Sequence, residues 1–510
     1  MWKKLITKLS TSDVKKRLND TGGIFSFVCR HNSTGASTSA STSTIYALSS
    51  GQGKCGVAVV RISGSRSLEA LKKMTSLLNP SPRQVFLRKI YDPITRDVID
   101  KGLCLWFPGP NSFTGEDSVE FQVHGGPAVI ESLMSALSKL EFTPAEPGEF
   151  TKRAFYNGKL DLTEIEGLAD LIHAETEQQR KQALLQADGS LSNLYNSWKK
   201  KLSTSLANIE AYIDFSEDDN IEQNVLENCN ERIKSLVSEI SKHLADGRRG
   251  EILRSGVRTV IIGQPNVGKS SLLNYLVRRN AAIVTPIAGT TRDIVELNTN
   301  ISGYPVILAD TAGLVTSTRD IVEEEGIKRA RSYAVTADFI ILMIDISNYL
   351  SSCKSISDYV RYYIDLLEIN DLIKDKQTNF IVVVNKIDLI NKDSEKIIND
   401  LKDYGAVPIS CDKEDGLSDL LNALTIKFKD ICGNPSRENP TISQTRHRIH
   451  LINCVDYLNN YLEMINKYEY DMVIAAQQIR FAMRELGKIT GHVSSEEILD
   501  IIFKNFCIGK

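Results

Sequence analysis

Residues Gly263-Gln264-Pro265-Asn266-Val267-Gly268-Lys269-Ser270 decide the fold of the central part of the chain. An apolar run, 259–262, precedes them, and an apolar-periodic run, 271–277, follows them. Strand, glycine loop and helix form the context in which the pattern G-x-x-x-x-G-K-S/T binds phosphate through backbone N–H groups and the helix dipole. We therefore expect Lys269 to reach the terminal phosphates of a nucleotide and the Ser270 hydroxyl to bind Mg²⁺. The alternative is a chance glycine turn before a helix.

Three further motifs follow apolar runs between residues 256 and 432. They are Asp310-Thr311-Ala312-Gly313, Asn385-Lys386-Ile387-Asp388 and Ser410-Cys411. Strands and helices alternate here, which predicts an α/β domain with a mostly parallel sheet. Because ligands of such sheets bind beyond the carboxyl ends of the strands, we expect all four loops to meet at one site.

The Asn-Lys-x-Asp motif predicts the base. The carboxylate of Asp388 can accept hydrogen bonds from both the ring N–H and the exocyclic amine of guanine, and Asn385 and Lys386 would support the base and the loop. Adenine offers no matching pair of donors, and an unpaired buried carboxylate is costly. The predicted nucleotide is therefore GTP, with Asp310 near the Mg²⁺ and the Gly313 N–H near the γ-phosphate.

The segment Thr290-Thr291-Arg292-Asp293 has the position of a switch loop. Thr291 would place its hydroxyl on Mg²⁺ while the γ-phosphate is present, which orders the loop before hydrolysis. Leu314 stands where Ras-like GTPases carry the glutamine that orients the attacking water. Leucine has no polar group, so another group must orient the water and neutralise the developing charge.

Composition limits the class of protein. The 510 residues suggest about three domains. The net charge of -3 excludes a generally basic surface, so any RNA contact needs a local patch. The nine cysteines form no C-x-x-C pair, which favours neither a zinc site nor a disulfide framework and indicates a reducing compartment. No apolar run reaches the length of a membrane span.

The first 44 residues differ from the rest. They hold seven Lys and Arg against two acids, and nine of the twelve residues 33–44 are Ser or Thr. This composition is typical of a mitochondrial transit peptide. A disordered extension without a targeting role is the alternative.

The remaining chain divides by pattern. Residues 45–160 predict a mixed α/β domain, and 161–255 and 433–510 are helical on either side of the α/β stretch 256–432. We therefore expect a discontinuous helical domain into which the nucleotide-binding domain is inserted. Within residues 45–160, the strand pattern alone favours Arg61 and Glu120 as solvated residues of strand edges.

Several further segments are more specific to one protein family than the GTPase motifs, which many families share. They are RISG at 61–64, FPGPNSFTGE at 107–116, HGGP at 124–127, PGEF at 147–150, RAFYNGK at 153–159, IVT at 283–285, IAGTTRD at 287–293 and CIGK at 507–510. With them, the chain from about residue 45 onward resembles the MnmE/TrmE family of tRNA-modification GTPases in its mitochondrial form.

The resemblance implies a tetrahydrofolate-binding N-terminal domain that also dimerises, a helical domain, and an inserted P-loop, Ras-like G domain. A 5-formyl-tetrahydrofolate or related folate would be the one-carbon donor, in contact with Arg61, Glu120, Lys159 and Lys510. This replaces the interpretation of Arg61 and Glu120 as edge residues. Basic groups suit folate carboxylates, and a carboxylate suits pterin N–H groups.

The resemblance also implies that G domains pair across their nucleotide faces and bind K⁺ there. The K⁺ ligands would be the side chains of Asn266 and Thr290 and the carbonyls of Thr285 and Ile287. The cation would neutralise transition-state charge as an arginine finger does.

Catalytic roles would fall to Lys269, to Glu323 as the residue that orients water, and to Cys507. Glu324 is the weaker candidate for the water, and a small apolar anchor is the alternative for Cys507. The full set of residues expected at GTP is Asn266, Val267, Gly268, Lys269, Ser270, Ser271, Thr285, Thr290, Thr291, Asp310, Thr311, Ala312, Gly313, Asn385, Lys386, Asp388, Ser410 and Cys411.

The implied function is modification of C5 of the wobble uridine in certain mitochondrial tRNAs, in the matrix, by a homodimer that works with an FAD protein resembling MnmG. GTP hydrolysis would drive rearrangement of the complex. The alternative is a ribosome-assembly GTPase of the Era/Der type, which shares the G motifs but would end in an RNA-binding domain. The helical pattern of residues 433–510 favours the first function.

Overall fold

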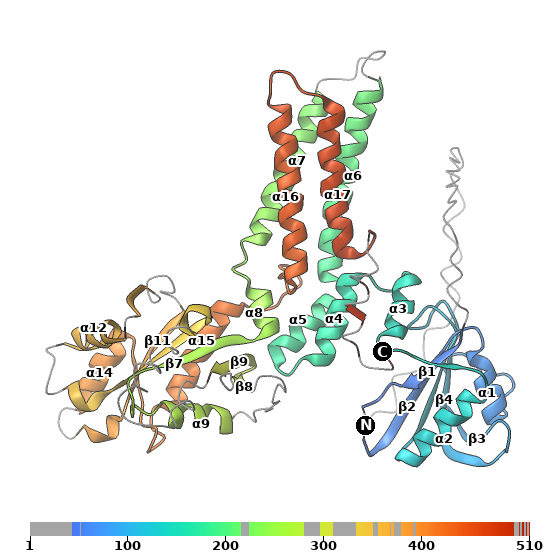
Figure 1. Cartoon of the computed structure of the whole chain (residues 1–510), viewed down its shortest axis with the longest axis horizontal. Coiled ribbons are helices and arrows are strands. Elements are labelled where there is room, and N and C mark those ends of the chain that lie inside the picture. The colour runs from blue at the N-terminus through green and yellow to red at the C-terminus, as the bar shows by residue number, and fades with distance from the viewer. Residues whose placement is uncertain are drawn as a thin grey trace, which may run out of the picture. The chain divides into compact units, whose positions relative to one another are not determined.

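A computed structural model describes residues 43–51, 53–215, 224–279, 296–309, 333–349, 355–367, 369–371, 379–390, 394–493, 499, 502–503, 506 and 509 (Figure 1). Within these ranges no helix combines the length and the apolar character that crossing a membrane requires. The elements form three groups: a first sheet with its helices, a second sheet with its helices, and a set of helices that comes from both sides of the second sheet in sequence.

The first sheet has the strand order β3-β4-β5-β2-β1-β6. Its elements are β1 (Ile45–Leu48), β2 (Cys55–Ser63), α1 (Ser67–Thr75), β3 (Phe86–Tyr91), β4 (Val98–Phe107), β5 (Ser118–Gly125), α2 (Pro127–Ser138), β6 (Thr143–Pro144) and α3 (Glu149–Tyr156). Val119, Phe121 and Val123 alternate with more exposed residues along β5, as the sequence pattern predicted. They pack with α1 and α2, so these helices cover one face of the sheet.

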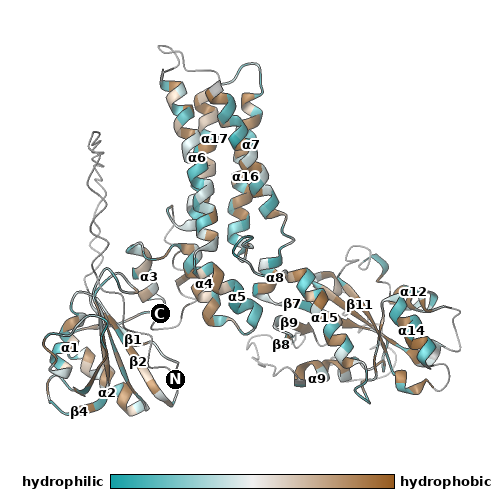
Figure 2. Cartoon of the chain, turned by 180° about the vertical axis from the view of Figure 1, so that it is seen from behind, coloured by the Kyte–Doolittle hydropathy of each residue, from teal (hydrophilic) through white to brown (hydrophobic). Residues whose placement is uncertain are grey.

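The helical set consists of α4 (Leu162–His173), α5 (Glu177–Ala187), α6 (Ser190–Phe215), α7 (Asn224–Leu244), α16 (Thr445–Ile465) and α17 (Met472–Thr490). Asp161 and Thr176 begin α4 and α5 with capping boxes, in which the cap side chain and the residue three positions later satisfy each other's backbone N–H groups. Helices α6, α7, α16 and α17 lie side by side, with apolar and polar residues alternating along them (Figure 2). One core joins residues 191–240 to residues 442–489, so helices from both sides of the second sheet are packed together.

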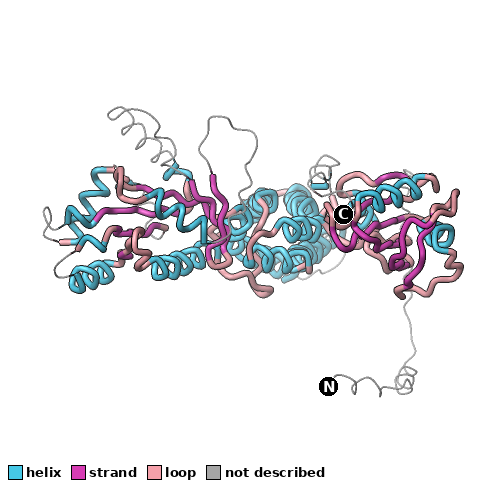
Figure 3. Tube along the Cα trace, turned by 90° about the horizontal axis from the view of Figure 1, so that it is seen from below, coloured by secondary structure: helices cyan, strands magenta, loops and turns pink. Residues whose placement is uncertain are grey.

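The second sheet has the order β12-β11-β10-β7-β9-β8. Figure 3 shows its strands in magenta and the accompanying helices in cyan. The elements are α8 (Arg249–Ser255), β7 (Val257–Ile262), α9 (Lys269–Arg279), β8 (Glu296–Ile301), β9 (Tyr304–Ala309), β10 (Phe339–Asp345), α12 (Ile356–Leu366), β11 (Phe380–Asn385), α14 (Ser394–Tyr404), β12 (Val407–Pro408) and α15 (Leu417–Cys432). All pairings are parallel except β8 with β9, which confirms the predicted mostly parallel sheet.

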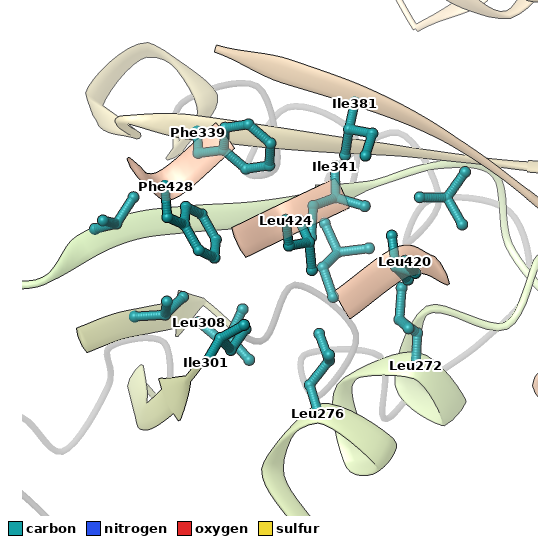
Figure 4. Packing of buried hydrophobic residues seen from close by; sticks show 14 of the residues in the cluster. Leu272, Leu276, Ile301, Leu308, Phe339, Ile341, Ile381, Leu420, Leu424 and Phe428 are labelled. Carbon is teal, nitrogen blue, oxygen red and sulfur yellow. The ribbon is translucent and has the colours of Figure 1, made fainter. Parts of the chain in front are cut away.

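Helices pack on both faces of this sheet. On one face, side chains of α9 and α15 point toward those of the strands, and the rings of Phe339 and Phe428 meet edge to face with centroids 5.3 Å apart (Figure 4). On the other face, α12 and α14 pack against β10 and β11. Strands β7, β10 and β11 are therefore buried on both sides, which explains their nearly continuous apolar sequences.

Candidate functional site

The predicted phosphate loop joins β7 to α9 and is packed against two neighbouring strands. A Cβ atom on Gly263 would lie 2.2 Å from the Met343 carbonyl oxygen, and a Cβ on Gly268 would lie 2.3 Å from the Asn385 amide nitrogen. Gly268 also has a φ of +103°, in the region that favours glycine. Both glycines of the motif are thus required for the loop to approach β10 and β11.

Lys269 begins α9 with its ammonium folded over the loop. Its Nζ donates to the carbonyls of Gly263 at 2.8 Å and Gln264 at 2.7 Å. Burial lowers the pKa of this lysine, because the charged form is less well solvated than in water. Ser270, Ser271 and Asn266 are exposed on the same loop and helix start, where their oxygens are accessible to a ligand.

Asn385 joins three of the predicted motifs. Its Nδ2 donates to the carbonyl of Val267 in the phosphate loop at 2.7 Å, and its Oδ1 accepts from the backbone N–H of Cys411 at 3.0 Å. The side chain is buried, so both amide atoms depend on these partners. The structure therefore brings the phosphate loop, the Asn-Lys-x-Asp motif and the Ser410-Cys411 loop together at the carboxyl ends of β7, β11 and β12.

Asp388 and Ser410 face each other across this site. The fully buried Ser410 hydroxyl donates to Oδ1 of Asp388 at 2.6 Å and accepts from the Lys413 N–H at 3.1 Å. Burial raises the pKa of the neighbouring Cys411 thiol to about 11, so this thiol is neutral at physiological pH. The serine fixes the orientation of the carboxylate that is expected to read the base.

Asp345 was not singled out by the sequence motifs. It ends β10, and its Oδ2 lies 2.6 Å from Nζ of Lys386 in the Asn-Lys-x-Asp motif. The signal available in the sequence was an acidic residue closing the apolar run 339–344, at the sheet edge where ligands bind.

Many predicted site residues lie outside the described residues. They are Thr285, Ile287, Thr290, Thr291, Asp310, Thr311, Ala312, Gly313, Leu314, Glu323, Glu324, Cys507 and Lys510.

A second candidate site lies on the first sheet, around Arg61 and Glu120. The two residues are cross-strand partners on β2 and β5, with Arg61 Nε and Nη2 each 3.0 Å from Glu120 Oε1. Strand-pattern reasoning alone placed them at solvated edges, which is wrong, because β2 and β5 are adjacent inner strands and both side chains are largely shielded. Residue-by-residue burial patterns do not reveal strand order.

Two aromatic residues from the segments FPGPNSFTGE and PGEF, to which the sequence assigned no individual role, border this ion pair. The guanidinium of Arg61 lies 5.2 Å from the ring centroid of Phe113 and 5.9 Å from that of Phe150. Lys159 donates from Nζ to the Pro110 carbonyl at 3.1 Å, in the same loop as Phe113. The arrangement combines a cation, a carboxylate and flat apolar rings, which suits a planar heterocycle with N–H groups.

Gly509 lies against this sheet. Ser49 Oγ donates to the carbonyl of Gly509 at 2.9 Å, and a Cβ on Gly509 would lie 2.2 Å from the Leu48 carbonyl oxygen. Gly509 has a φ of +94°. The residue before the C-terminal lysine is thus held beside β1, the strand that pairs with β2.

The face of the first sheet that carries Arg61 and Glu120 also carries apolar side chains. The register places Leu87, Leu103, Gln122 and Val59 in one cross-strand row, and Leu105, Glu120 and Arg61 in the next. Leu87 is 52% exposed, and Val57, in the irregular first part of β2, is 59% exposed. This apolar face is therefore only partly covered by the described residues of the chain.

Two family models match the chain. One, described as the MnmE helical domain, matches residues 162–507, and the other, described as the N-terminus of the GTP-binding protein TrmE, matches residues 44–159.

Several curated proteins are similar over nearly their whole length. A mitochondrial 5-taurinomethyluridine tRNA synthase subunit GTPB3 from Danio rerio is 49% identical, over 92% of this chain and 93% of the relative. The protein of the same name from Homo sapiens is 46% identical, over 95% and 96%. A tRNA modification GTPase MnmE from Rickettsia bellii is 45% identical, over 92% of this chain and 100% of the relative.

Among solved structures, the G domain of the T. maritima FeoB iron transporter is 26% identical with a TM-score of 0.23 and covers 34% of this chain and 98% of its own.

Proposed function

The chain belongs to the MnmE/TrmE family of tRNA modification GTPases, and we propose that it hydrolyses GTP in the modification of the wobble uridine of mitochondrial tRNA. It combines a TrmE-type N-terminal domain, a helical domain and a P-loop G domain. The animal relatives are named as mitochondrial, in agreement with the basic, Ser- and Thr-rich composition of residues 1–44. The observation that carries the GTPase assignment is Asn385, whose amide ties the phosphate loop to both base-recognition loops.

Base recognition is proposed to depend on Asp388, whose Oδ1 is already fixed by Ser410. The carboxylate would accept from the two adjacent N–H donors of guanine. Xanthine keeps the ring N–H but presents an oxygen in place of the amine, so an amide should fit it better than a carboxylate. We expect Asp388→Asn to bind xanthosine triphosphate more tightly than GTP. If Asp388→Asn still binds GTP more tightly than xanthosine triphosphate, Asp388 does not recognise the base.

The phosphates are proposed to lie on the loop that begins at Gly263. Lys269 would exchange its loop carbonyls for the terminal phosphates, and the exposed Ser270 hydroxyl suits Mg²⁺, which prefers oxygen ligands. Thr291 would complete the Mg²⁺ site, with Asp310, Thr311, Ala312 and Gly313 closing around the γ-phosphate. A bound Mg²⁺ would neutralise charge on the phosphate oxygens.

Potassium is proposed as a second cation, held by the exposed side chain of Asn266 with Thr285, Ile287 and Thr290. Glu323 would orient the attacking water, because Leu314 has no polar atom with which to do so. Measuring the rate of GTP hydrolysis in KCl and in NaCl tests whether K⁺ takes part in the reaction. Equal rates in the two salts would contradict it.

The Arg61–Glu120 pair is proposed to bind the pterin of a 5-formyl-tetrahydrofolate or related folate, with Lys159 and Lys510 near its acidic groups. The rings of Phe113 and Phe150 beside Arg61 and the docking of Gly509 beside β1 support this location. Cys507, close to that tail residue in sequence, is proposed to act at the same site.

The N-terminal domain is proposed to dimerise through the apolar sheet face defined by Leu87, Leu103, Leu105, Val57 and Val59. A second copy would cover side chains that are otherwise in contact with water. We expect Val57→Glu with Leu87→Glu to give a monomer in light scattering. Ile426→Glu, at a side chain that is 62% exposed on α15, is the matched control and should remain a dimer.

The G domain is proposed to be inserted into the helical domain, with boundaries near residues 256 and 432 and helical segments at 161–255 and 433–510. The shared core of residues 191–240 and 442–489 supports this arrangement. The segments that precede and follow the G domain in sequence also contact each other, which supports the same arrangement. A Cβ on Gly250 would lie 2.4 Å from the Ile442 carbonyl oxygen. With its two ends adjacent, the inserted domain would be joined to the helical domain at a single place.

The proposed partners are an FAD protein resembling MnmG and mitochondrial tRNA. The relatives' description as a synthase subunit supports a partner protein. Depletion of the protein followed by mass spectrometry of mitochondrial tRNA tests the function and identifies the side group. Normal modification at the wobble uridine would contradict it and would favour the Era/Der alternative.

A further inference from the structure

Asp345 lies at the end of β10, directly beside the Asn-Lys-x-Asp motif. The parallel register pairs Asp345 with Asn385, the last residue of β11. The Oδ2 atom of Asp345 lies 2.6 Å from Lys386 Nζ. The Oδ1 atom accepts from the Ser347 N–H at 2.8 Å and from the Ser347 hydroxyl at 2.5 Å. Both carboxylate oxygens are therefore engaged, one of them by the motif lysine.

Lys386 has an unusual backbone. Its φ of +69° and ψ of +33° place a residue with a long side chain in the left-handed region. Residues other than glycine rarely adopt such a conformation, and it persists only where the surroundings hold it. Asn385 is fixed on one side of Lys386 by Val267 and Cys411, and Asp345 fixes the far end of the lysine side chain.

Asp345 is itself well anchored. The Tyr359 hydroxyl donates to the Asp345 carbonyl and lies 3.2 Å from the Tyr363 hydroxyl, so α12 holds the end of β10. Burial opposes ionisation of the Asp345 carboxyl, yet hydrogen bonds from Lys386 and Ser347 hold its pKa below the ordinary value. The residue is thus an ionised group in a fixed position.

We propose that Asp345 is a positioning residue for guanine-nucleotide binding, which acts by holding Lys386 and, through it, the left-handed turn between Asn385 and Asp388. The proposal rests on the nucleotide site proposed above. Asp345 acts through the lysine and has no role at the γ-phosphate. GTP and GDP carry the same base, so loss of Asp345 should weaken both nucleotides equally and leave the chemical step unchanged.

The test is Asp345→Asn in the full chain, which keeps the shape and removes the charge. We expect the Kd values for GTP and GDP and the KM for GTP to rise together by about fivefold, since a partly buried ion pair contributes on the order of 1 kcal/mol. The kcat at saturating GTP should stay at the wild-type value. A fall in kcat with unchanged KM and Kd would overturn the proposal.

Asp92→Asn is the matched control. Asp92 makes an ion pair of the same length with Lys139, at 2.6 Å, and its side chain is 12% exposed against 15% for Asp345. Asp92 directly follows β3 and Lys139 directly follows α2, so this pair belongs to the elements of the first sheet and not to the nucleotide loops. If both variants lower thermal stability alike and neither changes nucleotide affinity, Asp345 has a structural role only.

A double-mutant cycle tests whether Asp345 acts through Lys386. In a Lys386→Met background, Asp345→Asn should cause no further loss of affinity, whereas additive losses would show an independent role and overturn the proposal. Asp345→Glu should recover part of the affinity. If Asp345→Asn does not fold, Ser347→Ala takes its place as the test. This variant should have wild-type stability and raise the KM for GTP by less than the rise expected for Asp345→Asn. An unchanged KM would contradict the proposal. Asp388→Asn tests the nucleotide site separately, whatever Asp345→Asn shows.

Discussion

Oε2 of Glu166 lies 2.6 Å from Nε2 of His447, although 281 residues separate the two in sequence. Oε1 of the same carboxylate accepts from Arg446 Nε at 3.1 Å and Nη2 at 2.9 Å. His447 is completely buried and Glu166 nearly so. A carboxylate on α4 thus ties the first part of the helical domain to the start of α16, the helix that follows the G domain.

Removing this carboxylate should destabilise the helical domain strongly. Glu166→Ala leaves Arg446 and His447 without their shared partner, and breaking a buried ion pair from one side costs about 3 to 5 kcal/mol. Urea denaturation followed by circular dichroism measures the loss. Asp188→Ala, which breaks an exposed pair with Arg437, is the control and should change stability little. Equal effects of the two variants would contradict the importance of the Glu166 network.

Stability should fall as the pH drops below about 6.5, in part through His243. Burial is the main cause that lowers the pKa of His243 to about 4; Asp246 opposes this shift, and the nearby Arg448 and His447 add to it. Between these two pH values the unfolded chain binds a proton that the folded chain does not, so stability rises with pH in this window. Denaturation midpoints at pH 7 and pH 5 measure the slope. His243→Gln should reduce the slope, and an unchanged slope would assign it to other groups.

Asn385→Ala should impair both GTP binding and the stability of the G domain. The substitution leaves the Val267 carbonyl and the Cys411 N–H without their buried partner, at about 1 to 3 kcal/mol each. We expect GTP affinity to fall at least tenfold in equilibrium binding. Asn157→Ala removes an amide hydrogen bond of equal length, 2.7 Å to the Thr114 carbonyl, in the N-terminal domain. It should leave GTP affinity unchanged, and a similar loss there would point to a general folding defect.

Gly509→Ala should weaken folate binding. A Cβ at this position would lie 2.2 Å from the Leu48 carbonyl oxygen, so residue 509 must move away from β1. Calorimetric titration with 5-formyl-tetrahydrofolate gives the change in Kd. Gly158→Ala is the control, because Gly158 also has a positive φ, +64°, but has open space around its Cβ position. If Gly158→Ala and Gly509→Ala reduce folate affinity equally, the contact of Gly509 with β1 does not contribute to folate binding.

The sequence by itself determined the local structures that carry the chemistry. The glycine loop between β7 and α9, the buried parallel strands and the polar residues at their carboxyl ends followed from short-range pattern, because backbone geometry and burial repeat over a few residues. The same holds for the alternating strand β5 and for the base-recognition motif at the end of β11. These features depend on near neighbours in the chain.

Only the tertiary structure decided which distant residues meet. It moved Arg61 and Glu120 from supposed edges to adjacent inner strands, placed Gly509 beside Leu48, and paired Asp345 with Lys386. Strand order and helix packing bring together side chains hundreds of residues apart, as with Glu166 and His447. No local pattern encodes such contacts, since each depends on how all the elements share their buried surfaces.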